Sequence, residues 1–278
     1  MPVGEEIDWV DNISIELTTQ MLATLFDFPF EDRRKLTRWS DVATANLEAG
    51  IIDSEDQRRE ELVECLTTFT EIFQARQHTP GDNDLITMLA HGESTKDLLA
   101  RPLEYLGNLI LLIVGGNDTT RNSITGGVLA LNENPDQYQK LKDNPSLITS
   151  MVPEIIRWQT PLAHMRRRAL VDTELGGKTI RAGDKVVMWY VSGNRDESAI
   201  EKPNEFIIDR AKPRQHLSFG FGIHRCMGNR LAEMQLRIVW EEILKRFETV
   251  EVVGEPTRIR SAFVKGYNSL PVVLHPKR

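Results

Sequence analysis

Two cysteines, Cys65 and Cys226, are all that this 278-residue sequence contains, so it lacks the paired thiols of a disulfide-stabilised fold. It also lacks an excess of basic charge. Its 34 Lys and Arg against 41 Asp and Glu give a net charge of −7, which argues against general nucleic-acid binding. The most apolar run, 109–114, is far too short to span a bilayer, and the acidic N-terminus has no signal-peptide pattern. These absences predict a soluble, cytoplasmic protein with no transmembrane segment and no nucleic-acid partner.

The hydrophobic pattern is helical over most of the first 160 residues. Apolar residues at helical spacing predict helices over 12–26, 31–47, a long stretch after Ser54, 85–89, 98–131, 136–142 and 146–158. Ser54 with Gln57 resembles a capping box, which marks the start of the third helix. Alternating or β-branched stretches predict short strands at 171–175, 178–180, 185–191, 250–253, 261–264 and 272–274, with a turn at 266–269. The predicted fold class is mainly α with a small β region.

A glycine-rich loop leads into a cysteine within residues 216–230, and a long amphipathic helix is predicted to begin at Cys226 and to end near Arg246. The positive end of a helix favours a thiolate over a thiol. Gly222 and Gly228 permit a close approach of the backbone. The pattern therefore indicates that the Cys226 thiolate is a metal ligand and that the loop contacts a flat cofactor. Haem, with Cys226 bound to its iron, is the best candidate. A buried structural thiol is the alternative for Cys226, and it is the predicted role of Cys65.

Two glycines interrupt the long predicted helix, and a polar stretch follows them as Gly115-Gly116-Asn-Asp118-Thr119-Thr. Each glycine costs about 1 kcal/mol relative to alanine inside a helix, so the pair needs a reason. One reading of Thr119 is a hydroxyl bonded to the carbonyl four residues earlier. One reading of Asp118 is a solvated charge.

Phe219, Gly222, His224, Cys226 and Gly228 fit the pattern F-x-x-G-x-H-x-C-x-G. In this the sequence resembles the haem-binding loop of the cytochrome P-450 monooxygenases. The resemblance runs along the chain and is closest to the soluble bacterial alkane-hydroxylating members, through segments 113–127, 158–166 and 261–267. It implies the cytochrome P-450 fold, with residues 1–278 as the C-terminal part of a single domain. Roughly the first third of a typical member has no counterpart here, so we expect an N-terminally incomplete fold.

The same resemblance implies haem b (iron protoporphyrin IX) as cofactor, with the Cys226 thiolate as axial ligand. Thr119 and Asp118 match the oxygen-activation motif, in which the alcohol helps to activate dioxygen and the acid relays protons. Gly115 lets the backbone lie close to the cofactor. Arg167 and His224 match the propionate ligands, where charge-assisted pairing suits the dianionic cofactor. Their alternatives are a basic surface strand and a hydrogen-bonded loop histidine.

Six residues are predicted by family position to contact the substrate, with ordinary core packing as the alternative: Leu112, Gly116, Leu162, Ala163, Met165 and Phe263. Their apolar character suits a hydrocarbon chain. The resemblance implies terminal hydroxylation of medium-chain alkanes or fatty acids with dioxygen. Electrons are expected from a ferredoxin and its ferredoxin reductase. The alternative function is a truncated remnant that binds haem, or is inert, without turnover.

Two further sets of charged residues follow from the resemblance. Glu154 and Arg157 match the pattern E-x-x-R. Arg210 is the arginine of the pattern P-x-x-F-x-x-x-R, which begins at Pro203. This set implies a buried carboxylate shared by two guanidinium groups, which is structural and not catalytic. The second set, Lys212, Arg214 and Arg225, is a candidate to attract an acidic ferredoxin, with a solvated basic patch as the alternative.

Overall fold

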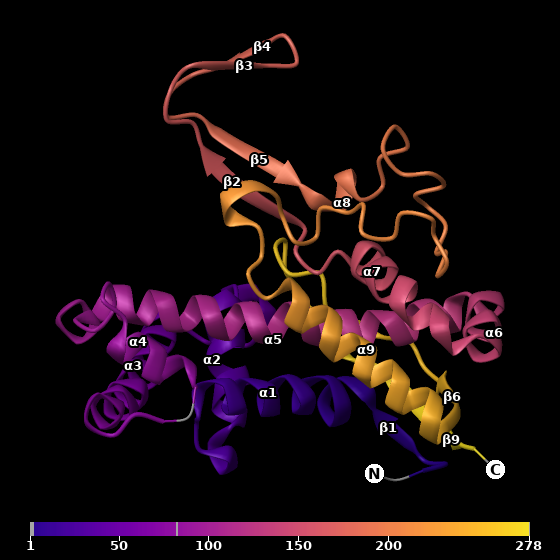
Figure 1. The fold of residues 1–278 in the computed structure, drawn as a ribbon, viewed down its shortest axis with the longest axis horizontal. Coiled ribbons are helices and arrows are strands. Elements are labelled where there is room, and N and C mark those ends of the chain that lie inside the picture. The colour runs from indigo at the N-terminus through magenta and orange to yellow at the C-terminus, as the bar shows by residue number, and fades with distance from the viewer. Residues whose placement is uncertain (1–2, 82, 278) are drawn as a thin grey trace. The chain divides into compact units, whose positions relative to one another are not determined.

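A computed structural model of the chain describes residues 3–81 and 83–277 (Figure 1). Its contacts divide these residues into two compact units. Unit 1 contains residues up to 125 together with 247–261 and the segment from 266 onward, and unit 2 contains 126–246 and 262–265. Helix α5 (Pro102–Glu133) contributes residues to both units. The single domain over 1–278 stays a prediction.

Unit 1 is built mainly from helices α1 (Glu16–Phe26), α2 (Arg34–Thr44), α3 (Glu55–His78), α4 (Leu85–His91) and the first part of α5. A π-helical segment, Val10–Ile15, precedes α1. Helix α3 begins as predicted, because Ser54 Oγ accepts a hydrogen bond from the Gln57 backbone N–H at 3.1 Å. Gln57 Oε1 reaches back to the Asp53 backbone N–H at 2.7 Å. These two bonds satisfy the Gln57 amide in the first turn and the Asp53 amide just before the helix.

The core of unit 1 is aromatic. Phe26, Phe28, Trp39 and Phe69 pack with ring centroids between 5.2 and 6.0 Å apart. Tilted and edge-to-face pairs of this kind contribute about 0.5–1.5 kcal/mol each beyond the area they bury. Cys65 is fully buried in the same cluster, which confirms its predicted core role.

Unit 1 also holds an antiparallel sheet in the order β1 (Glu6–Asp8), β9 (Pro271–Pro276), β6 (Phe247–Val252), and a short pair β7 (Thr257–Arg258) with β8 (Tyr267–Ser269). The strands predicted at 250–253 and 272–274 correspond to β6 and β9. The turn predicted at 266–269 is wrong, because β8 covers most of it. Asn122 Oδ1 of α5 accepts a hydrogen bond from the Tyr267 backbone N–H at 3.0 Å, and this long-range contact anchors the backbone at the start of β8.

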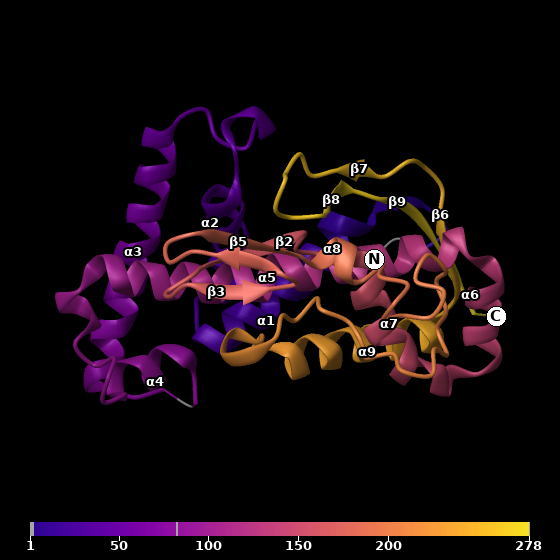
Figure 2. The same ribbon diagram turned by 90° about the horizontal axis from the view of Figure 1, so that it is seen from above.

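Unit 2 contains α6 (Pro135–Asp143), α7 (Ile148–Gln159), the short α8 (Tyr190–Gly193) and α9 (Asn229–Arg246). Two hairpins complete it, β2 (His164–Arg168) with β5 (Lys185–Trp189) and β3 (Thr173–Leu175) with β4 (Lys178–Ile180). Figure 2 shows β2 and β5 side by side. The strand predicted at 261–264 is wrong, since Val264 forms an isolated bridge to Leu162 outside the strands.

The observed fold is mainly α with small β regions, as predicted. Helices cover nearly all the stretches with helical periodicity, including the one long helix predicted over 98–131, which begins later because Pro102 is its first residue. Within the described part of the chain, no helix combines the length and the apolar character needed to cross a bilayer.

Candidate functional site

Cys226 lies in an exposed loop between a 3₁₀ turn (Gly222–His224) and α9. Helix α9 begins at Asn229, so Cys226 precedes the helix and does not open it as predicted. The Cys226 backbone N–H donates to Phe219 O at 2.8 Å, and Asn229 Nδ2 donates to Cys226 O at 2.6 Å. Gly222 has φ +75°, a left-handed conformation that favours glycine. The loop backbone is thus fixed on both sides of the thiol.

The prediction that this position favours the thiolate is wrong for the free thiol. Partial burial raises the pKa of Cys226 above its ordinary value, and the hydrogen bond from the Gly228 backbone and the charge of Arg225 only partly offset this. The helix effect is weak because it decays within the first turn, and Cys226 lies outside that turn. A bound metal deprotonates a coordinating thiol by itself. Ligation of iron by Cys226 therefore does not require a low pKa beforehand.

The loop around Cys226 exposes large apolar side chains. Phe221, Ile223 and Met227 are 84%, 97% and 87% exposed. Large apolar side chains that are this exposed within one short loop indicate a surface that a ligand or partner covers. Gly228 lies beside the thiol, since a Cβ there would be at an ordinary contact distance of 3.9 Å from Cys226 Sγ. A thiol in an exposed loop that also carries uncovered apolar side chains fits a broad apolar cofactor with a metal at its centre.

The predicted propionate ligands, Arg167 and His224, also lie in unit 2, and each has an N–H donor available to bind a further group. Arg167 is half-buried on β2, and its Nη1 donates only to the neighbouring Arg166 carbonyl at 3.1 Å. His224 is exposed in the 3₁₀ turn. Across residues 3–81 and 83–277, neither side chain has a carboxylate partner. Both can therefore bind an added carboxylate, and their assignment to the propionates stays a prediction.

Phe219 contacts His216, with ring centroids 5.4 Å apart. The Ser218 backbone N–H lies 3.3 Å from His216 Nδ1, so the ring accepts at this nitrogen. Burial, together with the charges of Arg157 and Arg225, lowers the pKa of His216 to about 4. His216 is therefore a neutral, packed support of the loop, a role that the sequence pattern did not identify.

In unit 1 the predicted oxygen-activation motif lies on α5. Thr119 is half-buried and its Oγ1 donates to Gly115 O at 2.9 Å, so the backbone-bonded reading of this hydroxyl is confirmed. Gly115 faces open space, since no atom lies within 4 Å of the position of an added Cβ. A Cβ on Gly116 would lie 2.7 Å from Leu22 Cδ2, so this glycine lets α5 approach α1.

Asp118 is not the solvated charge that one reading predicted, because only 1% of the residue is exposed. Arg121 Nη2 pairs with Asp118 Oδ1 at 2.9 Å. Burial raises the pKa of Asp118 to about 6 even though Arg121 opposes this shift. The i,i+3 spacing of Asp118 and Arg121 is the sequence signal that would have revealed the pair.

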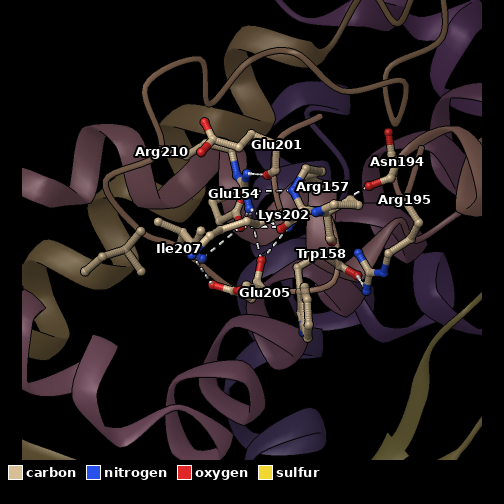
Figure 3. A network of polar contacts seen from close by, with 12 residues as sticks. Glu154, Arg157, Trp158, Asn194, Arg195, Glu201, Lys202, Glu205, Ile207 and Arg210 are labelled. Atoms are coloured by element: carbon tan, nitrogen blue, oxygen red, sulfur yellow. Dashed lines mark hydrogen bonds and ion pairs between the residues drawn. The ribbon is translucent and has the colours of Figure 1, made fainter. Parts of the chain in front are cut away.

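Glu154 is shared by two guanidinium groups, as predicted (Figure 3). Arg157 donates through Nε at 2.8 Å and Nη2 at 2.7 Å, and Arg210 donates through Nε at 2.9 Å and Nη2 at 3.2 Å. Arg157 Nη1 also donates to Asn194 O at 2.9 Å and to Pro203 O at 2.8 Å. The network therefore ties α7 to the irregular segment before the Cys226 loop.

Sequence reasoning missed Asn194, which is fully buried beside this network. Its Nδ2 donates to Thr160 Oγ1 and to Ser218 Oγ, both at 2.8 Å. Its Oδ1 accepts from the Leu217 backbone N–H at 2.6 Å. Asn194 thus connects the end of α7 to the segment that leads into the Cys226 loop.

The predicted substrate contacts are half-buried. In unit 2, the Ala163 backbone N–H donates to Phe263 O at 2.9 Å, and Leu162 bridges Val264. The Phe263 ring lies 5.8 Å from the ring of His164, the residue before Met165. The structure thus brings Leu162, Ala163 and Phe263 together, while Leu112 and Gly116 lie on the unit 1 part of α5. Their role toward a substrate stays a prediction.

Comparison with known proteins agrees with this geometry. Residues 4–268 match the Cytochrome P450 family. Linalool 8-monooxygenase of Pseudomonas putida is 39% identical over 277 residues, covering 100% of this chain and 68% of that protein. Steroid C26-monooxygenase of Mycolicibacterium smegmatis is 31% identical over 273 residues, covering 98% of this chain and 68% of that protein.

Among solved structures, cytochrome P450-153 from Novosphingobium aromaticivorans superposes with a TM-score of 0.90 at 50% identity, over 99% of this chain and 67% of that one. Similarity at this level extends through both units. The chain therefore belongs to the cytochrome P450 family, as a monooxygenase that uses haem b with the Cys226 thiolate as axial ligand.

Proposed function

We propose that this monooxygenase hydroxylates the terminal methyl group of an aliphatic substrate, a medium-chain alkane or fatty acid, using dioxygen and electrons from a ferredoxin and its reductase. The observation that carries the proposal is the apolar group formed by Leu162, Ala163 and Phe263, which the structure brings together from two distant segments. An alkyl chain offers no hydrogen bonds, so apolar side chains are what can bind it. The resemblance of segments 113–127, 158–166 and 261–267 to the alkane-hydroxylating cytochromes P-450 favours the same substrate class.

Haem b, when bound, supplies the dioxygen activation that inserts one oxygen atom into the substrate. Cys226 would hold the iron through Sγ, and Arg167 and His224 would pair with the propionate carboxylates. Asp118 can hold or release a proton near neutral pH because burial raises its pKa to about 6. Thr119 Oγ1 can pass a proton because a hydroxyl both donates and accepts. Leu162, Ala163 and Phe263 would exclude water and orient the alkyl chain.

The ferredoxin part of the proposal rests on exposed cations in unit 2. Lys212 and Arg225 are exposed, and among the residues that the structure describes they form no ion pair. Arg214 is exposed but pairs with Glu233 at 2.7 Å. Exposed cations steer an acidic partner through long-range attraction. We expect the rate of reduction by an acidic ferredoxin to fall steeply with added salt, and to fall in a Lys212→Ala, Arg225→Ala variant at low salt.

Haem titration of the purified chain tests the cofactor site. We expect a Soret shift on binding and, after reduction with dithionite in the presence of carbon monoxide, the red-shifted band of thiolate ligation. Cys226→Ala should lose that band, whereas Cys65→Ala, which removes the buried thiol of unit 1, should keep it. Survival of the band in Cys226→Ala would exclude Cys226 as the ligand.

Product analysis tests the substrate class. Incubation with a series of linear alkanes and fatty acids, a ferredoxin system and labelled dioxygen should give labelled terminal alcohols. Phe263→Ala should change the preferred chain length, while Phe221→Ala, in the Cys226 loop, should not. Exclusive formation of internal alcohols, or haem binding without any oxidised product from this series, would overturn the proposal.

A further inference from the structure

A largely buried group of ion pairs joins helices α2 and α5 of unit 1, and one of its carboxylates is partly exposed to solvent. Arg121 Nη2 lies 2.9 Å from Asp118 Oδ1 and also 2.9 Å from Asp41 Oδ1. The side chains of Arg121 and Asp118 are 5% and 1% exposed, whereas that of Asp41 is 29% exposed. One guanidinium nitrogen is therefore divided between a buried carboxylate and a carboxylate that reaches water.

The two oxygens of Asp118 have unequal surroundings. Oδ1 also accepts from Ser40 Oγ and from Asn117 Nδ2, each at 3.2 Å. Within the described part of the chain, Oδ2 has a single weak contact, with Thr44 Oγ1 at 3.4 Å. Across the described residues, these groups and Arg121 are the ones that α2 and α5 direct at the carboxyl. A proton taken up by Asp118 therefore belongs on Oδ2, the oxygen with fewer donors, and half-buried Thr44 borders that oxygen.

Asp41 acts on Asp118 in two ways. Its charge repels the Asp118 carboxylate, and it draws away part of the hydrogen bonding of Arg121. Burial is the largest cause of the raised pKa of Asp118, and Asp41 adds to it while Arg121 opposes it. Arg121 Nε is buried and has no hydrogen-bond partner in the part of the chain that the structure describes. The guanidinium group therefore has an N–H donor without an acceptor, and it can pair with Asp118 alone when Asp41 is neutral.

We propose that Asp41 is a positioning residue for proton delivery, which shares Arg121 with Asp118 so that Asp118 Oδ2 can take up a proton from solvent past Thr44. The step forms one O–H bond on Oδ2, and the carboxylate returns when that proton is passed on. This inference rests on the proposed role of Asp118 as a proton donor. A purely structural Asp41 would hold α2 against α5 without changing the titration of Asp118.

The titration of Asp118 in the haem-free chain of 278 residues separates these cases. With ¹³C-labelled aspartate, the Asp118 carboxyl resonance is identified by its loss in Asp118→Asn. We expect Asp41→Asn to move the Asp118 midpoint to lower pH, because Arg121 then pairs with Asp118 alone. Each unit of that shift lowers the protonated fraction at neutral pH about tenfold. Asp41→Glu should restore the wild-type midpoint.

Two further variants sharpen the test. Arg121→Gln should move the midpoint in the opposite direction, to higher pH, and if it fails to fold, Asp41→Asn still decides. Asp56→Asn removes an exposed carboxylate on α3 and should leave the midpoint unchanged. An Asp118 midpoint in Asp41→Asn equal to that of the wild type would overturn the proposal. Failure of haem binding or turnover in the loaded enzyme would instead count against the proposed function, since this titration needs no haem.

Discussion

Glu154 and Arg157 form a doubly hydrogen-bonded pair one turn apart on α7, and both side chains are fully buried. Two parallel N–H···O bonds to one carboxylate fix its plane as well as its charge. Arg210 then approaches the same carboxylate from the segment that precedes the Cys226 loop. The pair therefore acts as the fixed point to which this irregular segment is attached.

Removing the charge of Glu154 should unfold this network. Glu154→Gln leaves two buried guanidinium groups without a counter-ion, and breaking a buried pair costs about 3–5 kcal/mol. Urea denaturation followed by circular dichroism measures the loss. Arg237→Ala, which removes an exposed i,i+4 pair with Glu241 on α9, is the matched control and should cost at most about 1 kcal/mol. Equal losses in the two variants would contradict the anchoring role.

The set around Glu154 was predictable because the resemblance to the family supplied it, through the patterns E-x-x-R and P-x-x-F-x-x-x-R. Other parts were not, because distant segments impose them. Tyr267 is held extended by Asn122, which is 145 residues away in the sequence. Asp118 is buried because α2 covers it, and nothing in the pattern of α5 indicates which helix that is. Asn194 was missed because the partners of its side-chain amide lie on segments that are distant in the sequence.

The stability of the chain should depend on pH through His216. The pKa of His216 falls from 6.5 to about 4 in the folded state, so the unfolded chain binds the proton more tightly. The contribution of neutral His216 to the free energy of unfolding is fully present above pH 6.5, and it is lost as the pH falls through 4. As the pH falls from 6.5 to 4, the free energy of unfolding of the wild type should decrease by up to about 3 kcal/mol more than that of His216→Asn. His78→Asn, at the exposed end of α3, is the control and should follow the wild type.

Gly127 lets α5 pack closely against α7. A Cβ there would lie 2.8 Å from Ile155 Cδ1. Gly127→Ala should therefore destabilise the protein by about 1–3 kcal/mol through overpacking. Gly107 lies on the same helix with no atom within 4 Å of its Cβ position, so Gly107→Ala should stabilise by up to about 1 kcal/mol. Thermal melts compare the two. If Ile155→Val does not partly rescue Gly127→Ala, the clash is not the cause.

Thr119→Ala should lower the amount of product formed per electron consumed by about tenfold and raise hydrogen peroxide release, because the hydroxyl that passes protons is lost. The change removes one hydrogen bond to Gly115 O, which costs about 0.5–1.5 kcal/mol of stability. Ser123→Ala is the matched control, since Ser123 Oγ bonds back to Thr119 O at 2.8 Å one turn later on α5. The control should lose similar stability with unchanged coupling, and Thr119→Ser should keep both. Equal uncoupling in Ser123→Ala would show that a disturbed helix, and not the Thr119 hydroxyl, controls peroxide release.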